Sequence, residues 1–170
     1  MNKKLIDFNL KALCFKQRAF LFLHSMKVEE ITSKEEMLAN LSLLQEVYPT
    51  LTKEDYSSEL DSMLPYNYGQ VGVYIGEECV GITGYWIGSK LWCGKYLELD
   101  NVVVSKKHQS KGIGKILFDF MELKAKNLNC NMLALDTYTN NFKAHKFFYK
   151  QSYAPRGFHF INIIDESGIR

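Results

Sequence analysis

Apolar residues along this chain follow two periods that alternate from residue 26 onward. Short runs that are fully apolar, or that alternate with polar residues, are typical of strands, whereas apolar residues every three or four positions are typical of amphipathic helices. The strand pattern occupies residues 26–31, 71–75, 79–86, 96–104, 132–135 and 158–163. The helical pattern follows Ser33 and Thr52, and covers residues 112–127 and 141–151. The order β-α-α-β-β-β-α-β-α-β predicts a mixed α/β fold with a central strand–helix–strand crossover.

Local signals define the ends of several elements. Ser33 with Glu36 three residues later forms a capping box, and Thr52 is a second helix-capping residue. The turn at residues 76–78, Gly-Glu-Glu, joins two strands into an antiparallel hairpin. The apolar stripe of the first helix is predicted to consist of Met37, Leu41, Leu44 and Val47.

The length of 170 residues suits one domain with a single core, and no repeat or linker divides the chain. Residues 26–170 are predicted to form this domain. Residues 1–25 stand outside the pattern as an N-terminal extension of unknown role: a packed helix, a partner-binding arm, or a leader before a start at Met26. Residues 8–24 are apolar but carry three basic residues, so neither a secretory signal nor a membrane span of about 20 apolar residues is predicted.

Charge and cysteine content exclude several classes of function. The net charge of +2 is too small to indicate nucleic-acid binding, but residues 1–85 carry 8 Lys/Arg and 12 Asp/Glu, and residues 86–170 carry 13 and 7. This distribution suits a polyanionic cofactor on one side and a cationic substrate on the other. The cysteines form no C-x-x-C pair and the histidines lack metal-ligand spacing, so no metal site is predicted. Isolated cysteines indicate a reducing cytoplasm.

A glycine-containing loop between a strand and a helix is the first candidate binding site. The apolar run that ends at Val104 is followed by a polar loop and by Gln109-Ser-Lys-Gly-Ile-Gly114, where a helix begins. The first backbone N–H groups of a helix have no intrahelical partner, and with the helix dipole they favour a phosphate. Four lysines add positive charge: Lys106, Lys107, Lys111 and Lys115. The alternative is an ordinary strand–turn–helix corner with glycine caps, because neither G-x-G-x-x-G nor a P-loop is present.

A second motif lies on the last predicted helix, where Asn141, Ala144 and Phe147 follow the spacing N-x-x-A-x-x-F. Together with Q-x-x-G-x-G in the preceding loop, this spacing resembles the GNAT superfamily of N-acetyltransferases over roughly Met26 to Ile163. The resemblance implies a single-domain GNAT fold: a mixed central sheet with a β-α-β acyl-CoA-binding core and splayed central strands. Acetyl-CoA is then the expected co-substrate, and the acetyl group would pass to a primary amine by direct attack in a ternary complex.

The resemblance also implies which residues would bind acetyl-CoA. The pantetheine arm would lie along one strand and against the last helix, with the pyrophosphate on the loop between them. The expected cofactor-binding residues are Val102, Val103, Val104, Gln109, Ser110, Lys111, Gly112, Ile113, Gly114, Lys115, Asn141, Ala144 and Phe148.

Two carboxylates are the candidate catalytic groups. An alkyl amine has a pKa near ~10, so a base must accept its proton before it can attack. Glu98 and Asp100 are two residues apart on one strand and should face the same side. The resemblance favours Glu98 as the base. Either residue could instead attract a cationic acceptor, and the simplest alternative is a pair of solvated surface carboxylates.

The chain departs from the family pattern near the expected thioester. Phe148 stands where the family often has a tyrosine, and Ser152-Tyr153 replaces Gly-Phe, which leaves the general acid undefined. The main alternative is therefore a non-catalytic acyl-CoA-binding or sensing module. The expected acceptor is a small-molecule amine or a protein amino group, with no nucleic-acid or membrane partner. A homodimer is possible, and His159 is a minor candidate for the acceptor site.

Overall fold

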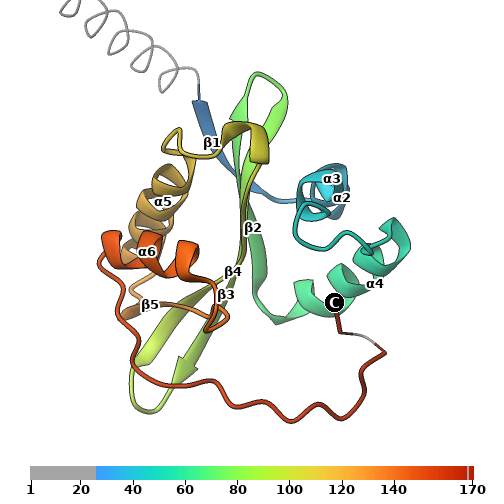
Figure 1. Ribbon diagram of the computed structural model, residues 1–170. Coiled ribbons are helices and arrows are strands. Elements are labelled where there is room, and N and C mark those ends of the chain that lie inside the picture. The colour runs from blue at the N-terminus through green and yellow to red at the C-terminus, as the bar shows by residue number, and fades with distance from the viewer. Residues whose placement is uncertain (1–25, 168) are drawn as a thin grey trace, which may run out of the picture.

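The computed structural model describes residues 26–167 and 169–170, and it contains one five-stranded sheet in the order β1-β2-β3-β4-β5 (Figure 1). The first four strands are antiparallel to their neighbours, and β5 runs parallel to β4. The strands are β1 (Met26–Ile31), β2 (Tyr68–Ile75), β3 (Glu78–Lys90), β4 (Gly94–Val104) and β5 (Met132–Leu135). The N-terminal extension of residues 1–25 lies outside the described residues.

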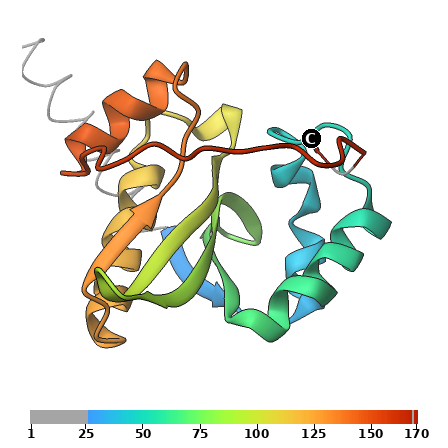
Figure 2. The ribbon, with the colours of Figure 1, turned by 90° about the horizontal axis from the view of Figure 1, so that it is seen from below.

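Helices cover both faces of the sheet (Figures 1 and 2). On one face lie the short helices α2 (Lys34–Ala39) and α3 (Leu41–Leu44), then α4 (Lys53–Met63) and the 3-10 turn η1 (Leu64–Tyr66). On the other face lie α5 (Ile113–Asn127) and α6 (Phe142–Lys150), and a second 3-10 turn, η2 (Lys106–His108), precedes α5. The predicted caps are confirmed: the Ser33 and Glu36 capping box starts α2, and the Thr52 hydroxyl accepts the N–H of Asp55 at the start of α4.

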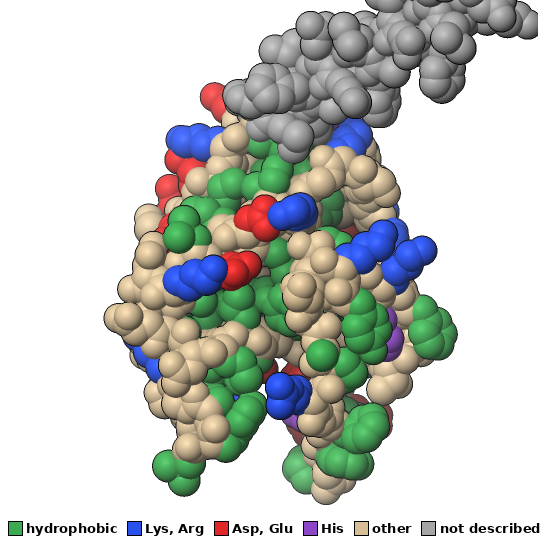
Figure 3. Space-filling model, turned by 90° about the vertical axis from the view of Figure 1, so that its left-hand side faces the viewer, with side chains coloured by type: hydrophobic (Ala, Val, Ile, Leu, Met, Phe, Trp, Pro, Cys, Tyr) green, Lys and Arg blue, Asp and Glu red, His purple; other side chains and the backbone are tan. Residues whose placement is uncertain are grey.

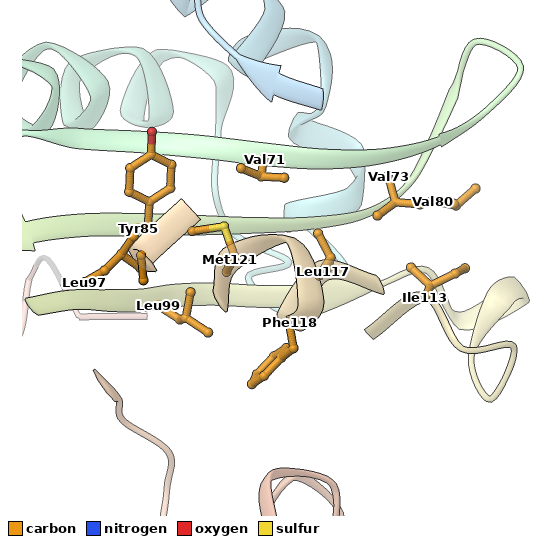
Figure 4. Close-up of a cluster of buried hydrophobic side chains, with 11 residues drawn as sticks. Val71, Val73, Val80, Tyr85, Leu97, Leu99, Ile113, Leu117, Phe118 and Met121 are labelled. Atoms are coloured by element: carbon orange, nitrogen blue, oxygen red, sulfur yellow. The ribbon is translucent and has the colours of Figure 1, made fainter. Parts of the chain in front are cut away.

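Each helical layer closes a separate part of the core. The cluster beneath α5 contains Val71, Val73, Val80, Tyr85, Leu97, Leu99, Ile113, Leu117, Phe118, Met121 and Ala125 (Figure 4). The cluster beneath α2–α4 contains Ile31, Met37, Leu43, Leu44, Leu51, Tyr56, Leu60, Tyr68, Ile82 and Val103. Successive strand residues point to opposite faces, so an alternating strand contributes to both clusters.

Strand β4 changes its register in the middle. Gly84 pairs with Asp100 but Ile82 pairs with Val103, so β4 has one more residue than β3 between these pairs. Asn101 adopts a left-handed backbone, with φ of 51°. One extra residue is a β-bulge, and it shifts the inward and outward positions by one. Leu99 therefore packs beneath α5, whereas Val103 packs beneath α2–α4.

The central strands splay apart, as predicted. Strands β4 and β5 pair only from Tyr96 with Met132 to Leu99 with Leu135. Strand β4 then continues to Val104 with no strand beside it on that edge among the described residues. Apart from the Val104 carbonyl oxygen, which accepts from Gln109, backbone groups on this open edge could pair with a ligand that binds as an added strand would.

Two predicted elements were wrong. The first helix does not continue to residue 47: it breaks at Asn40, whose side chain donates to the Glu36 carbonyl oxygen (3.1 Å), and Val47 is half exposed. The final strand, residues 158–163, is absent among the described residues. A strand depends on neighbours to pair with more than on its own propensity, and this segment runs past the end of β5 towards α4 (Figure 2).

No helix among the described residues has both the length and the apolar character to cross a membrane.

Candidate active site

The N-terminus of α5 has the backbone geometry of an anion site. Gly112 is the N-cap residue with φ of 89°, and no side chain caps the helix. Ser110 also has a left-handed backbone, with φ of 62°. The first N–H groups of α5 therefore lack the side-chain acceptor that usually satisfies them. A phosphate at this end would accept from them and meet the positive end of the helix dipole.

The rest of the loop is held by side chains rather than by the core. Gln109 bridges two elements, since its Nε2 donates to the Val104 carbonyl oxygen (3.4 Å) and its Oε1 accepts from Lys143 Nζ (2.7 Å). Lys115 forms an ion pair with Asp119 (2.6 Å), so part of its charge is already compensated. Lys143 therefore adds a positive charge beside the loop that sequence reasoning had not assigned.

Gly112 and Gly114 are required as glycines for two different structural reasons. Gly112 needs its left-handed backbone, which residues with a Cβ rarely adopt. A Cβ on Gly114 would lie 3.1 Å from the Phe147 ring, so this glycine lets α5 and α6 pack closely. Ile113 is 1% exposed and belongs to the core, so only its backbone N–H could serve a ligand.

The open edge of β4 lies next to this loop. Val103 is buried beneath α2–α4, and Val102 and Val104 pack towards α5, so the ligand-accessible groups of all three residues are on the backbone. At the start of α6, the Asn141 side-chain oxygen accepts the N–H of Ala144 (3.2 Å). This cap uses the Asn141 oxygen, so Nδ2 is the side-chain atom that a ligand could contact.

The face of the sheet beneath α2–α4 gathers carboxylates at the point of splay. Leu97 and Leu99 point towards α5, so Glu98 and Asp100 point to the opposite face. Asp136 directly follows Leu135, the last residue of β5, which pairs with Leu99. It is a further carboxylate near the point where the two strands separate, and sequence reasoning did not name it.

Aromatic side chains fix this acidic face. Trp86 Nε1 donates to Asp100 Oδ2 (3.1 Å), and the Tyr48 hydroxyl donates to Asn101 Oδ1 (2.7 Å). Burial, with the nearby charge of Asp100 and the Tyr138 hydroxyl, raises the pKa of Tyr48, which therefore stays protonated at neutral pH. The asparagine at position 101 could have indicated a left-handed backbone from the sequence, since asparagine tolerates this conformation better than most residues.

A buried polar network lies behind these residues. Gln70 is 2% exposed, and its Nε2 donates to the hydroxyls of Tyr56 (2.7 Å) and Tyr68 (2.9 Å). Burial raises the pKa of Tyr56 to about 12. The Tyr68 ring packs on Trp86, with centroids 4.9 Å apart. The network therefore supports Trp86 through the ring of Tyr68.

On α6, adjacent aromatic residues point in different directions. Phe148 stacks on Phe118, with centroids 5.8 Å apart, and also lies near Tyr153. Tyr149 is 60% exposed. Burial raises the pKa of Tyr153 to about 12, so its hydroxyl keeps its proton at neutral pH.

The two described histidines nearest the end of β5 contact polar groups. His145 Nε2 lies 2.9 Å from the Tyr138 carbonyl oxygen. His159 Nδ1 lies 2.6 Å from Asp136 Oδ2, with both side chains more than half exposed. This contact places His159 beside the residue that follows β5.

Comparison with known proteins gives the site a context. The sequence model of the Acetyltransferase (GNAT) family matches residues 36–153, a range that contains the loop, the acidic face and both motifs. No curated protein matches the sequence.

Many solved structures share the fold at low identity. Glucosamine-6-phosphate N-acetyltransferase from Arabidopsis thaliana is 17% identical, with a TM-score of 0.66 over 82% of this chain and 99% of that one. An aminoglycoside N-acetyltransferase in complex with CoA is 14% identical, with a TM-score of 0.71 over 82% and 95%. A GNAT family acetyltransferase from Staphylococcus aureus is 18% identical, with a TM-score of 0.68 over 82% and 99%.

Proposed function

Because this chain belongs to the GNAT family of acetyltransferases, which use acetyl-CoA, we propose that it transfers the acetyl group to a primary amine by direct attack in a ternary complex. The proposal rests on the arrangement of groups at the point where β4 and β5 separate. An uncapped helix N-terminus and an open strand edge lie on one side of it. Glu98 and Asp100 point to the face beneath α2–α4, and Asp136 follows the end of β5.

Acetyl-CoA supplies the acetyl thioester when it is bound. The backbone N–H groups of residues 110–115 would hold its pyrophosphate, since the left-handed Gly112 and the uncapped α5 suit an anion. The backbone of residues 102–104 and the side chain of Asn141 would hold the pantetheine arm. The small side chain of Ala144 would let α6 lie close enough to cover the arm, and Phe148 would form an apolar wall.

The acidic face would prepare the acceptor. Glu98 would accept the amine proton, directly or through a water molecule, because it points to the face beneath α2–α4 and forms no ion pair among the described residues. Asp100 is held by Trp86 (3.1 Å) and would orient the incoming cation. A backbone N–H near Val104 would stabilise the negative charge that develops on the acyl oxygen.

The alternative is an acyl-CoA-binding or sensing module without turnover. The observation that favours it is Phe148, whose ring is stacked on Phe118 and carries no proton to donate. Thiol release from acetyl-CoA, measured across a panel of amines, separates the two functions. Release that depends on an amine supports the transferase, whereas CoA binding by calorimetry without release from any amine supports the sensor.

The acceptor is a small-molecule amine or a protein amino group. Two of the structural neighbours are named for glucosamine-6-phosphate and for aminoglycosides, which are small amines, and the carboxylates of this face suit a cation. We place the enzyme in the cytoplasm because Cys79, Cys93 and Cys130 are free thiols.

A further inference from the structure

The β-bulge in β4 places two successive side chains on one face of the sheet. In a regular strand, Asp100 and Asn101 would point to opposite faces. Here the Asp100 carboxylate accepts from Trp86, and the Asn101 side-chain oxygen accepts from Tyr48. Both aromatic side chains pack against the cluster beneath α2–α4. Bulges next to functional sites re-aim side chains in this way, so the face proposed for the acceptor depends on how this bulge is held.

Donors from two further segments hold the bulge itself. The Thr83 hydroxyl of β3 lies within hydrogen-bond distance of the carbonyl oxygens of Gly84 (2.9 Å) and Asp100 (3.2 Å). The Tyr48 hydroxyl, from the segment between α3 and α4, donates to Asn101 Oδ1 (2.7 Å). This second contact joins the left-handed residue of the bulge to the helical layer above it.

Tyr48 is a firmly placed donor. Its N–H donates to the Leu44 carbonyl oxygen (2.9 Å), and its own carbonyl oxygen accepts the N–H of Leu51 (3.0 Å). Burial, together with the nearby charge of Asp100, raises the pKa of Tyr48, so its hydroxyl keeps its proton at neutral pH. A donor whose own position is fixed by packing and backbone bonds can hold the group that it contacts. Tyr48 therefore holds Asn101, rather than the reverse.

Uncharged donors orient the acidic face, in contrast to the α5 side of the molecule. On the α5 side, Lys115 pairs with Asp119 (2.6 Å) and Lys126 pairs with Glu122 (2.6 Å). Figure 3 shows acidic and basic side chains next to each other on that side. Asp100 forms no ion pair among the described residues, so its orientation depends on uncharged donors. Salt screens exposed ion pairs, but it should have little effect on these hydrogen bonds.

We propose that Tyr48 and Asn101 are positioning residues, and that their hydrogen bond fixes the bulge of β4 for bound acetyl-CoA and its acceptor. The inference rests on the proposed function. With the bond in place, Asp100 faces the acceptor, and the open edge of residues 102–104 stays in line for the ligand. Neither residue needs to touch the acetyl group. A shift of about 1 Å near the reacting atoms can lower a rate by ~10²-fold. Because the other two contacts to the bulge would remain, we expect a smaller loss.

The test is amine-dependent thiol release from acetyl-CoA, with a panel of amines that includes glucosamine-6-phosphate and sisomicin. Tyr48→Phe removes the hydroxyl, and Asn101→Gly removes the amide while glycine keeps the left-handed backbone. Each variant should lower kcat about tenfold, equally at low and high salt. The Kd of CoA, measured by calorimetry, should change less than twofold because the loop at α5 is untouched. The double variant should lose no more than either single variant, because both changes remove the same bond.

Tyr74→Phe is the matched control. Tyr74 is also partly buried, and its hydroxyl accepts from Asn40 Nδ2 (3.3 Å) on β2, away from β4. This variant should keep the wild-type kcat, and urea unfolding checks that every variant is folded. Wild-type kcat in a folded Tyr48→Phe overturns the proposal. Additive losses in the double variant, or an equal loss in Tyr74→Phe, also overturn it, because the effect then does not come from the contact with Asn101.

Hydrogen exchange separates this proposal from the proposed function. If the wild-type protein releases thiol with no amine, the transferase function fails, and exchange at the N–H groups of residues 100–104 is then measured with CoA bound. Faster exchange in Tyr48→Phe than in Tyr74→Phe supports the role of Tyr48 in fixing the bulge. Equal exchange in the two variants overturns it.

Discussion

Ser110→Asp is a sharp test of the anion site at the N-terminus of α5. Ser110 is exposed and has a left-handed backbone, which aspartate and asparagine both tolerate. Substitution of Gly112 would strain the backbone, and substitution of Gly114 would push a Cβ against Phe147. Ser110→Asp instead adds one negative charge with little change in shape, and Ser110→Asn is the neutral control of the same shape.

The expected size of the effect follows from the exposure of the loop. Two unit charges about 5 Å apart repel by ~0.8 kcal/mol in bulk water and by ~3 kcal/mol at an effective dielectric constant near 20. The loop lies at the surface, beside Lys143 and Lys115, so the value should fall between these limits. We expect CoA affinity to fall about tenfold, or ~1.4 kcal/mol.

Calorimetry with CoA at low and high salt measures this effect. The loss in Ser110→Asp relative to Ser110→Asn should shrink at high ionic strength, because exposed charges are screened within about 10 Å at 0.1 M salt. Equal affinity of the two variants at low salt would refute the assignment of the pyrophosphate to this loop.

Three further predictions concern the reaction and the packing around it. Glu98→Gln should lower kcat by about 10²–10⁴ and remove the acidic limb of the pH–rate profile, whereas Asp100→Asn should act mainly on KM for a cationic acceptor; wild-type kinetics in both would make them surface carboxylates. Gly114→Ala should destabilise the fold by ~1–2 kcal/mol in urea unfolding, since the Phe147 ring is packed against two other phenyl rings and cannot retreat; unchanged stability would show that the ring adapts. Tyr149→Phe should retain most activity, and a ~100-fold drop in kcat with intact CoA affinity would identify Tyr149 as the acid.

Local signals predicted much of the architecture. Residues close in sequence determine the caps at Ser33 and Thr52, the hairpin turn and the crossover helix. The sequence pattern therefore predicted these features. The N-terminus of α5 belongs to the same class, since a glycine N-cap is visible in the sequence. The prediction of a final strand was wrong because residues 158–163 have the composition of a strand, but the sequence does not say which strand they would pair with.

The acidic face needed contacts between distant parts of the chain. Tyr48 reaches Asn101 across 53 positions, and Trp86 reaches Asp100 across 14. The bulge at Asn101 reverses which β4 residues face α2–α4, and no periodicity in the sequence predicts its position. Candidate carboxylates could therefore be named from sequence, but their surroundings could not.

The absence of a phenol at Phe148 fits an enzyme whose leaving group departs without strong acid assistance. A CoA thiolate resembles that of cysteine, with a pKa near ~8.5, so at neutral pH it needs little help from a general acid. Phe148 is stacked on Phe118, and Tyr149 is 60% exposed. The demanding proton transfer is the one from the amine, whose pKa near ~10 lies far above neutral pH. In the proposed reaction, Glu98 and Asp100 would lie where that proton is removed.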